Sequence, residues 1–266
     1  MSKKARSVLA PYVDTLQRRH RRAVAAAIPP ASDLLLDTQH LLAGVEGLDA
    51  IFEAITLGAR RLGFERCAYG LRIKVPFTRP ETIIISNYDA RWQQRYRDAN
   101  YLDTDPTVAH GARSGEPIIW SDDVFKHTPQ LWSEARDCGL RVGWAQSCFG
   151  AKGMVGMLSL VRSHEALSSA EIAQHDPFLR CLANIAHLAL SAGFARDHPA
   201  WHPKLTAREI EVLQWTADGK NTEDVAQLLH ISVNTVKFHI KNVIEKLDVP
   251  NKPAAVARAT ALGFLD

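Results

Sequence analysis

The chain has 266 residues, of which 46% are hydrophobic and 23% are charged, and its net charge is +3. This composition excludes a mostly disordered protein, and the length favours two folded domains over one. No run approaches the roughly 18 consecutive apolar residues of a membrane-spanning helix, so we expect no membrane segment. The four cysteines (Cys67, Cys138, Cys148 and Cys181) form no C-x-x-C pair, which argues against a zinc site or a disulfide framework and favours the cytoplasm.

The positive charge is concentrated near the N-terminus. Residues 1–22 carry a net charge of +6, residues 201–266 carry none, and the segment between them carries −3. The apolar run over residues 23–28 is too short for the core of a signal peptide, and two prolines follow it. We therefore predict that residues 1–32 form a basic extension, either a solvated tail or an arm that binds nucleic acid.

Residues 33–194 combine helical and strand patterns. Apolar residues recur at helical spacing in four segments, which predicts helices over residues 34–62 (in two pieces separated near Gly44 and Gly47), over 92–99, from Pro106 onward and over 169–194. Runs rich in apolar residues predict strands over residues 65–73, 82–86, 143–150 and 154–162. The last two strands are separated by residues 151–153, which suits a hairpin. Helices that flank an antiparallel sheet predict an α+β fold in which this region is an α/β/α sandwich.

Residues 195–204 are polar and contain proline, which predicts a linker, and residues 205–266 show a wholly helical pattern. Thr206 and Glu209 have the spacing of a capping box at a helix start, and Gly219 is placed to end that helix in a left-handed turn. Three more helices are predicted, beginning after Asn221 or Thr222, after Ser232 and near Pro253. The C-terminal region is therefore predicted to be an all-α domain of four helices.

The third of these helices has two different faces. Its apolar residues fall at steps of four, three and four and form one buried stripe: Val236, Ile240, Val243 and Leu247. A second set gathers on the opposite side: Asn234, Lys237, Phe238 and Lys241. Such a helix can lie in the major groove of DNA, where Lys and Asn reach base edges, while Thr235 and His239 meet phosphates. Any surface helix exposes lysines, so this pattern alone also fits an ordinary solvated helix.

The C-terminal sequence resembles the LuxR-type helix-turn-helix. The similarity is carried by Leu205-Thr-Ala-Arg-Glu-Ile-Glu-Val-Leu213, Gly219-Lys220, Ile231-Ser-Val-Asn-Thr-Val-Lys-Phe-His239, Lys246-Leu247 and Asn251-Lys252. The resemblance implies a unit that binds double-stranded DNA as a dimer, with Lys237 and Lys241 at positions of base-contacting residues. It also implies that the last helix supplies contacts between subunits.

A second group of residues lies between positions 88 and 120. Tyr88, Trp92 and Tyr96 are spaced to share one face of a helix, and Asp105 follows in the next segment. Aromatic rings with polar tips beside a carboxylate can line an apolar pocket with a few placed hydrogen-bonding groups. An ordinary aromatic core stripe, with Asp105 capping a helix, is the alternative.

The segment from about residue 35 to 190 resembles the acyl-homoserine-lactone-binding domain of LuxR-type quorum-sensing receptors. The resemblance implies that Trp92 donates to the lactone carbonyl and that Asp105 accepts from the ligand amide. The other implied contacts are made by Tyr88 and Tyr96 near the acyl carbonyl, Trp120 on the lactone ring, the motif position Gly143, and the hydroxyls of Ser159 and Thr107. A carboxylate buried without a partner is costly, so Asp105 is expected to need the ligand or a water molecule.

Together these patterns predict a transcription regulator that binds an N-acyl-homoserine lactone and, as a homodimer, a pseudo-palindromic promoter site. RNA polymerase is a further candidate partner, and no other cofactor is expected. The alternative is an orphan regulator of the same fold that senses a different small molecule. An enzyme is not expected, because Cys138, Cys148, His164 and His175 show no spacing typical of a nucleophile and its base.

Overall fold

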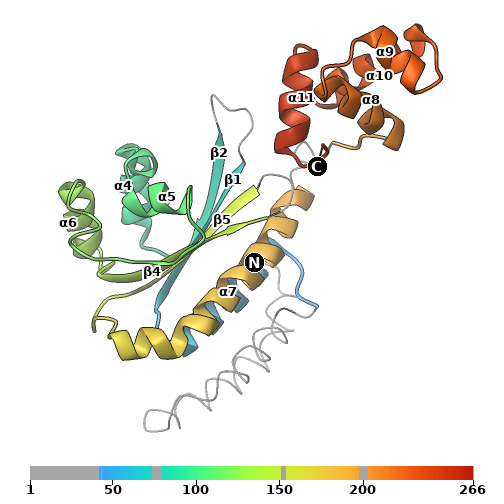
Figure 1. The fold of residues 1–266 in the computed structure, drawn as a ribbon. Helices are drawn as coiled ribbons and strands as arrows, with labels where there is room; N and C mark the ends of the chain where they lie inside the picture. The colour runs from blue at the N-terminus through green and yellow to red at the C-terminus, as the bar shows by residue number, and fades with distance from the viewer. Residues whose placement is uncertain (1–41, 43, 74–79, 151–153, 198–202, 266) are drawn as a thin grey trace.

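The computed structural model describes residues 42, 44–73, 80–150, 154–197 and 203–265. Three features of the sequence prediction lie wholly or mostly outside these residues: the basic extension 1–32, the first helical piece before Gly44 and the hairpin turn 151–153. Half of the predicted linker 195–204 is described, and its residues 195–197 belong to the end of a helix. The described residues form an N-terminal region of mixed helices and strands and a C-terminal region of helices (Figure 1).

A five-stranded antiparallel sheet forms the centre of the N-terminal region, with the strand order β2-β1-β5-β4-β3. Its strands are β1 (Arg66–Ile73), β2 (Glu81–Ser86), β3 (Ile118–Ile119), β4 (Val142–Phe149) and β5 (Met154–Arg162). The four longer strands confirm the sequence prediction. The prediction missed β3, because two adjacent apolar residues are too short a run to show the alternation of a strand.

Strand β1 shows how the sheet separates two environments. Side chains alternate between the two faces of a strand. Cys67, Tyr69 and Leu71 therefore point to one face, where they are fully buried. Ala68 and Gly70 point to the other face, where they line a cavity.

Helices α3 (Leu48–Arg61) and α7 (Ser169–Asp197) cover the face that carries Tyr69. They pack on each other and on the sheet, and Ile55, Ala59 and Leu190 at this contact are fully buried. The length and apolar composition of α7 are those of a membrane-spanning helix, although it contains no unbroken apolar run. However, 56% of its most apolar stretch is buried inside the protein, as expected for the core helix of a folded domain.

The opposite face of the sheet is covered by α4 (Ala90–Asp98), the 3₁₀ turn η1 (Tyr101–Asp103), α5 (Pro106–Gly111) and α6 (Pro129–Asp137) (Figure 1). Helix α5 begins where the sequence predicts, with Pro106 in its first turn, whereas α4 begins at Ala90, two residues before the predicted start. Tyr88 precedes α4 and its N-cap Asp89, so the prediction that Tyr88 shares a helix face with Trp92 and Tyr96 is wrong. The prediction missed η1 and α6, since each is too short for a helical period to stand out. Helices on both faces of an antiparallel sheet confirm the predicted α/β/α sandwich.

Four helices form the C-terminal region: α8 (Ala207–Ala217), α9 (Thr222–Leu228), α10 (Val233–Lys246) and α11 (Lys252–Ala261). Their ends are set by the local sequence. Thr206 and Glu209 form the predicted capping box, and Gly219 adopts a φ of +83° after α8. Asn221 and Ser232 cap α9 and α10 through their side chains. The predicted four-helix domain is confirmed.

An ion pair attaches α10 to α8 in this domain. The Lys246 Nζ atom lies 2.7 Å from Oε2 of Glu209, whose side chain is buried. Burial acts to raise the pKa of Glu209, but hydrogen bonds from Lys246 and Thr206 outweigh it and hold that pKa below its usual value. Since α10 carries the predicted DNA-facing residues, Glu209 helps to hold this helix in place.

Candidate functional site

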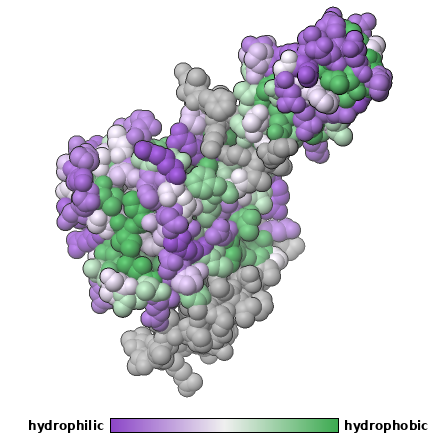
Figure 2. Space-filling model, in the orientation of Figure 1, coloured by the Kyte–Doolittle hydropathy of each residue, from purple (hydrophilic) through white to green (hydrophobic). Residues whose placement is uncertain are grey.

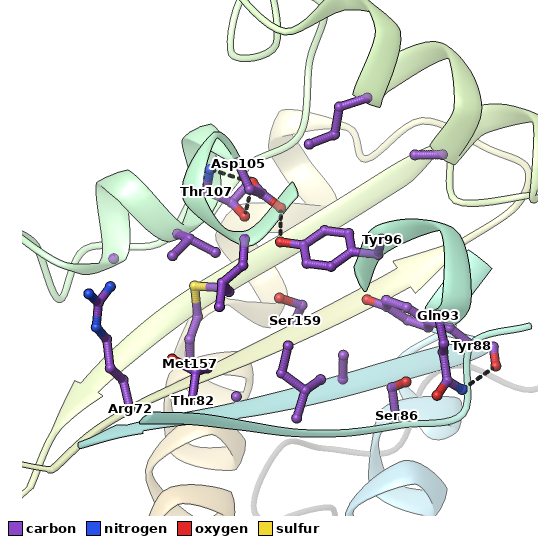
Figure 3. Close-up of a pocket in the computed structure, with 18 of the residues that line it drawn as sticks. Arg72, Thr82, Ser86, Tyr88, Gln93, Tyr96, Asp105, Thr107, Met157 and Ser159 are labelled. Atoms are coloured by element: carbon purple, nitrogen blue, oxygen red, sulfur yellow. Dashed lines mark hydrogen bonds between the residues drawn. The ribbon is translucent and has the colours of Figure 1, made fainter. Parts of the chain in front are cut away.

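A cavity of about 420 Å³ lies between the sheet and the helices α4 and α5 (Figure 3). Alternate residues of β1, β2 and β5 form its floor: Ala68, Gly70, Arg72, Thr82, Ile84, Ser86, Val155, Met157 and Ser159. Seven of the eight residues that the sequence assigns to a ligand line this space: Tyr88, Trp92, Tyr96, Asp105, Thr107, Trp120 and Ser159. The eighth residue, Gly143, acts on the cavity through Trp120.

Asp105 is the acidic residue among the described residues that line the cavity. Its Oδ1 atom accepts from the Thr107 backbone N–H at 2.8 Å and from the Thr107 hydroxyl at 2.7 Å. Its Oδ2 atom accepts from the Tyr96 hydroxyl at 2.9 Å (Figure 3). Asp105 thus both caps α5 and faces the cavity. The expectation that it needs a ligand or water as partner is wrong, because Thr107 and Tyr96 already satisfy it.

The carboxylate of Asp105 nevertheless has acceptor capacity to spare. Each carboxylate oxygen can accept two hydrogen bonds, and Oδ2 uses one. Only 9% of the residue is exposed, and burial raises the pKa of Asp105 while the bonds from Thr107 and Tyr96 oppose that rise. A ligand N–H that reaches Oδ2 would therefore meet an acceptor shielded from water.

Two other polar atoms of the cavity wall are buried without a hydrogen-bond partner in the described structure. They are the Tyr88 hydroxyl and the Trp120 indole Nε1. Burial raises the pKa of Tyr88 well above its usual value, so the phenol keeps its proton. Buried donors are almost always paired in proteins. These two atoms therefore indicate where an acceptor of a bound molecule would lie.

The aromatic residues of α4 and η1 pack against one another beside Asp105. Trp92 and Tyr96 meet edge to face with ring centroids 5.8 Å apart, and Tyr101 stacks on Trp92 at 6.1 Å. Trp92 is buried. Both descriptions of this stripe from the sequence therefore apply: the rings are packed as a core, and the same rings bound a cavity.

Gly143 of β4 leaves room for Trp120. A Cβ atom at this position would overlap the indole ring of Trp120. The backbone N–H of Trp120 donates to the Gly143 carbonyl at 2.8 Å. The Trp120 ring packs edge to face on Phe125 and Trp132, with centroids 5.8 Å and 6.4 Å apart. Glycine at position 143 thus allows the indole to lie flat against the sheet at one end of the cavity.

An ion pair joins α4 to α6 above the cavity. Arg95 donates to both carboxylate oxygens of Glu134, at 2.7 Å and 2.8 Å. Tyr101 and Gln130 donate to the same carboxylate at 2.8 Å and 3.1 Å. These bonds, with that from Arg95 the strongest, lower the pKa of Glu134 to about 2. The bridge holds the helix that carries Trp92 over the sheet.

Several lining residues were not identified from the sequence, among them Gly70, Arg72, Ile84, Ser147 and Met157. All five lie on strands, at positions whose side chains point to the cavity face. The period-two pattern of each strand gives these positions. Which of the two faces borders a cavity depends on how the helices pack, and the sequence pattern does not contain that information.

The DNA-facing residues predicted for α10 lie on its outer side. Asn234, Lys237 and Lys241 are exposed, and 59% of the Phe238 side chain surface is accessible. Val236 and Val243 point inward and are buried, as predicted. Lys241 lies 3.7 Å from Glu245, and the Thr235 hydroxyl is bonded to Ser232 in the helix cap. The view in Figure 2 shows a largely hydrophilic surface over the C-terminal helices.

Comparisons with known proteins match both regions. The model of the autoinducer binding domain matches residues 47–190, and that of the LuxR family of bacterial regulatory proteins matches residues 203–259. The chain is 40% identical over 230 residues to the transcriptional activator protein SolR of Ralstonia solanacearum, covering 86% of the chain and 98% of SolR. It is also 40% identical over 218 residues to the HTH-type quorum-sensing regulator RhlR of Pseudomonas aeruginosa, covering 81% and 89%.

Two solved structures share the fold. SdiA, a regulatory protein of Escherichia coli, in complex with octanoyl-rac-glycerol is 31% identical with a TM-score of 0.78, covering 88% of this chain and 95% of SdiA. The N-acylhomoserine lactone dependent LuxR family transcription factor CepR2 of Burkholderia cenocepacia is 30% identical with a TM-score of 0.59. That match covers 62% of this chain and 97% of the CepR2 chain.

Proposed function

Because the chain belongs to the LuxR family of quorum-sensing transcription regulators, whose members are not enzymes, we propose which residues bind its signal, an N-acyl-homoserine lactone, and which bind DNA. In this proposal residues 33–194 are the receptor domain and residues 205–266 the DNA-binding domain. Residues 195–204 link them, and residues 1–32 are a separate extension.

The single observation that carries the ligand assignment is the arrangement of Asp105 and Tyr88. A buried carboxylate with free acceptor capacity faces the same cavity as a buried phenol that lacks a partner. An acyl-homoserine lactone has one amide N–H, which suits Asp105, and an amide carbonyl, which suits Tyr88. Its acyl chain suits the apolar part of the floor around Gly70, Ile84 and Met157.

The remaining lining residues complete the contacts in this proposal. Trp92 donates its indole N–H to the lactone carbonyl, and Trp120 packs on the lactone ring. Tyr96 packs near the acyl carbonyl without donating to it, because its hydroxyl proton is donated to Asp105. The supporting contacts come from the hydroxyls of Ser159 and Thr107 and from Gly143, which gives Trp120 its place.

Binding of the lactone stabilises the receptor domain by mass action. A ligand present at a hundred times its dissociation constant adds about 2.7 kcal/mol to the free energy of unfolding. This gain is a substantial fraction of the roughly 5–15 kcal/mol by which a typical domain is stable. We expect the stabilised receptor to form a homodimer, which sets two α10 helices about one helical turn of DNA, or a small multiple of it, apart on a pseudo-palindromic site.

The DNA contacts are proposed for the exposed side of α10. Lys237 and Lys241 reach guanine edges, and Asn234 reaches an adenine edge. Thr235 contacts a phosphate, and Phe238 packs on an exposed thymine methyl group. Contact with RNA polymerase follows if the regulator activates transcription from such a site. These roles are supported by the exposure of the side chains and by the family match over residues 203–259.

A second candidate signal is an acylglycerol. SdiA, whose fold this chain shares, has been solved in complex with octanoyl-rac-glycerol. Such a molecule has an acyl chain and hydroxyl groups but no N–H. Asp105 could accept from a glycerol hydroxyl, so the cavity geometry alone allows both classes.

The assignment is tested by titrating the purified full-length protein with N-octanoyl-homoserine lactone and with octanoylglycerol, in wild-type and Asp105→Asn forms. Asparagine keeps a side-chain oxygen to cap α5, but its amide group replaces Oδ2 and faces the ligand N–H with a second donor. We expect the lactone to bind the wild-type protein and to lose about 10- to 100-fold in affinity in the variant. Asp105→Ala is less suitable, because it also removes the cap of α5.

Tyr88→Phe provides a second arm, since it removes the unpartnered hydroxyl and leaves the ring. Its lactone affinity should fall by a smaller factor, roughly three- to tenfold. Should octanoylglycerol bind tightly and the lactone not at all, the acylglycerol becomes the signal. An Asp105→Asn protein that binds the lactone as tightly as wild type would remove Asp105 from the ligand site.

A further inference from the structure

The floor of the cavity is a regular grid of cross-strand neighbours. Three rows cross β2, β1 and β5, and every member lines the cavity: Ser86–Ala68–Ser159, Ile84–Gly70–Met157 and Thr82–Arg72–Val155. Successive rows are two residues apart along β1, which corresponds to about 7 Å, so the first and third rows are roughly 13 Å apart. The position of each row therefore corresponds to a distance along an acyl chain that lies on the floor.

The three rows differ in chemistry. The first row carries the hydroxyls of Ser86 and Ser159 and lies at the end of the cavity near Tyr88 (Figure 3). The second row is apolar, and Gly70 at its centre leaves open space, since a Cβ there would meet only Ile84 Cγ1 at 4.0 Å. A hydrocarbon chain can thus lie directly on β1 after it leaves the polar end.

The third row contains the cation Arg72. Figure 3 shows its side chain standing up from the sheet at the end of the cavity opposite Ser86 and Tyr88. Residue 72 is exposed, and its guanidinium makes no hydrogen bond or ion pair with any other residue that the structure describes. The other cavity-lining arginine, Arg97, differs, because it donates to Gln94 at 3.0 Å.

A guanidinium group at this end of the cavity makes the binding of a long hydrocarbon chain less favourable. Each methylene that lies on the apolar second row raises affinity about fourfold. A methyl group that reaches the third row instead removes water from Arg72 and offers no acceptor in exchange, which is unfavourable. The gain per methylene should therefore stop, and reverse, where the chain meets Arg72.

We propose that Arg72 limits the length of the acyl chain that the cavity accepts, so that the preferred chain ends on the second row beside Ile84 and Met157. This proposal depends on the lactone assignment above. It makes Arg72 a specificity-determining residue, and it leaves the polar contacts of the lactone head group unchanged.

The test is a titration of the full-length protein with a series of unsubstituted N-acyl-homoserine lactones from butanoyl to dodecanoyl. In wild type we expect affinity to rise with chain length, pass through a maximum and fall. In Arg72→Leu the rise should continue, so that the dodecanoyl lactone gains about tenfold or more over wild type while the butanoyl lactone changes less than about twofold. Arg72→Lys keeps a cation and should keep the maximum.

Arg91→Leu is the matched control, because Arg91 is highly exposed on α4 and does not line the cavity. Arg72→Gln removes the charge without adding an apolar group, so its gain in affinity for long-chain lactones should be smaller than that of Arg72→Leu. It also tests the proposal if the leucine variant folds poorly. The same chain-length profile in wild type, Arg72→Leu and Arg72→Gln would overturn the proposal, as would an equal loss for every chain length. If no lactone of the series binds wild type or the variants, the lactone assignment itself fails, and this proposal fails with it.

Discussion

The ligand cavity and the outer face of α10 are built in different ways. The cavity gathers residues between Ala68 and Ser159 from four strands and several short helices, and most of its lining residues are buried or half-buried. The face of α10 comes from one helix, between Asn234 and Lys241, and most of it is exposed. A buried site therefore depends on packing throughout the sandwich, whereas an exposed site depends mainly on a correctly held helix.

The largest expected effect is the loss of DNA binding when the exposed site on α10 is changed and the cavity is left intact. Lys237→Ala together with Lys241→Ala should weaken specific DNA binding by about 2–6 kcal/mol, at about 1–3 kcal/mol for each lost base contact. Lactone affinity and thermal stability should stay at the wild-type values, because both side chains are exposed. Gel-shift and calorimetric titrations measure the two affinities.

Lys126→Ala is the control for that double variant, because it removes an exposed lysine from the other region. It should leave DNA binding unchanged. Wild-type DNA affinity in the Lys237 and Lys241 double variant would show that this side of α10 does not face DNA.

The next largest effect is expected from a change in the buried site that leaves α10 intact. Gly143→Ala places a Cβ inside the indole of Trp120, so the ring must shift or the strand must bend. Such overpacking costs about 1–3 kcal/mol of stability and should weaken lactone binding as well. A thermal melt followed by ligand titration measures both quantities.

Gly219→Ala is the glycine control in the C-terminal region, where a Cβ would meet open space but φ is +83°. It should destabilise the C-terminal helices and leave lactone binding intact. A Gly143→Ala protein with wild-type stability and lactone affinity would contradict the close contact between β4 and Trp120.

A smaller effect is expected when the N-cap of α9 is removed, which tests whether the C-terminal helices influence the ligand cavity. Asn221→Ala removes the side-chain oxygen that accepts from Asp224 N–H at 2.8 Å, and it should cost about 1 kcal/mol of stability. Asn221→Asp keeps an oxygen at this position and should be close to neutral. A fall in lactone affinity in the alanine variant would show that this cap affects the ligand cavity as well as the C-terminal helices.

The smallest effect is the acid sensitivity of the Arg95–Glu134 bridge. The folded-state pKa of Glu134 is lowered to about 2, so its contribution to stability is present above the ordinary glutamate pKa and is lost as pH falls from there towards 2. Glu134→Gln should reduce the loss of stability between pH 5 and pH 3. The gain is modest, since both side chains are partly exposed.

Denaturant unfolding at several pH values measures this effect in wild type and Glu134→Gln. Glu165→Gln serves as the control. It removes a different carboxyl group, which makes no bond to α4 in the described structure and so takes no part in the bridge. An identical pH dependence in wild type and Glu134→Gln would show that the bridge adds nothing to the stability of the helices above the cavity.

The C-terminal region was predicted almost completely from the sequence. The side chains of its capping residues Thr206, Asn221 and Ser232 each accept from the backbone N–H three positions further on, so the helix starts follow from local chemistry. The inward positions of α10 follow from a period of 3.6 residues. Here the sequence pattern and the tertiary structure contain nearly the same information.

The cavity was predicted only in part. Tyr88, Trp92, Tyr96 and Asp105 were found because their spacing predicted one aromatic helix face followed by a helix cap. The structure places Trp92 and Tyr96 on α4 and Asp105 at the cap of α5, whereas Tyr88 precedes α4. The sequence did not show that Thr107 and Tyr96 satisfy Asp105, since those bonds depend on how α4 packs beside α5. It also did not place Arg72 at the end of the cavity.

The sequence by itself determined the two-region organisation, most strands and helices, the caps and the outward face of α10. These features depend on interactions between residues a few positions apart. Only the tertiary structure decided that a cavity lies between the sheet and α4, which of the described donors there lack a protein partner, and at which end of the floor Arg72 lies. Those properties arise from the register of β1 with β2 and β5 and from helix packing, because both bring together residues that no local period connects.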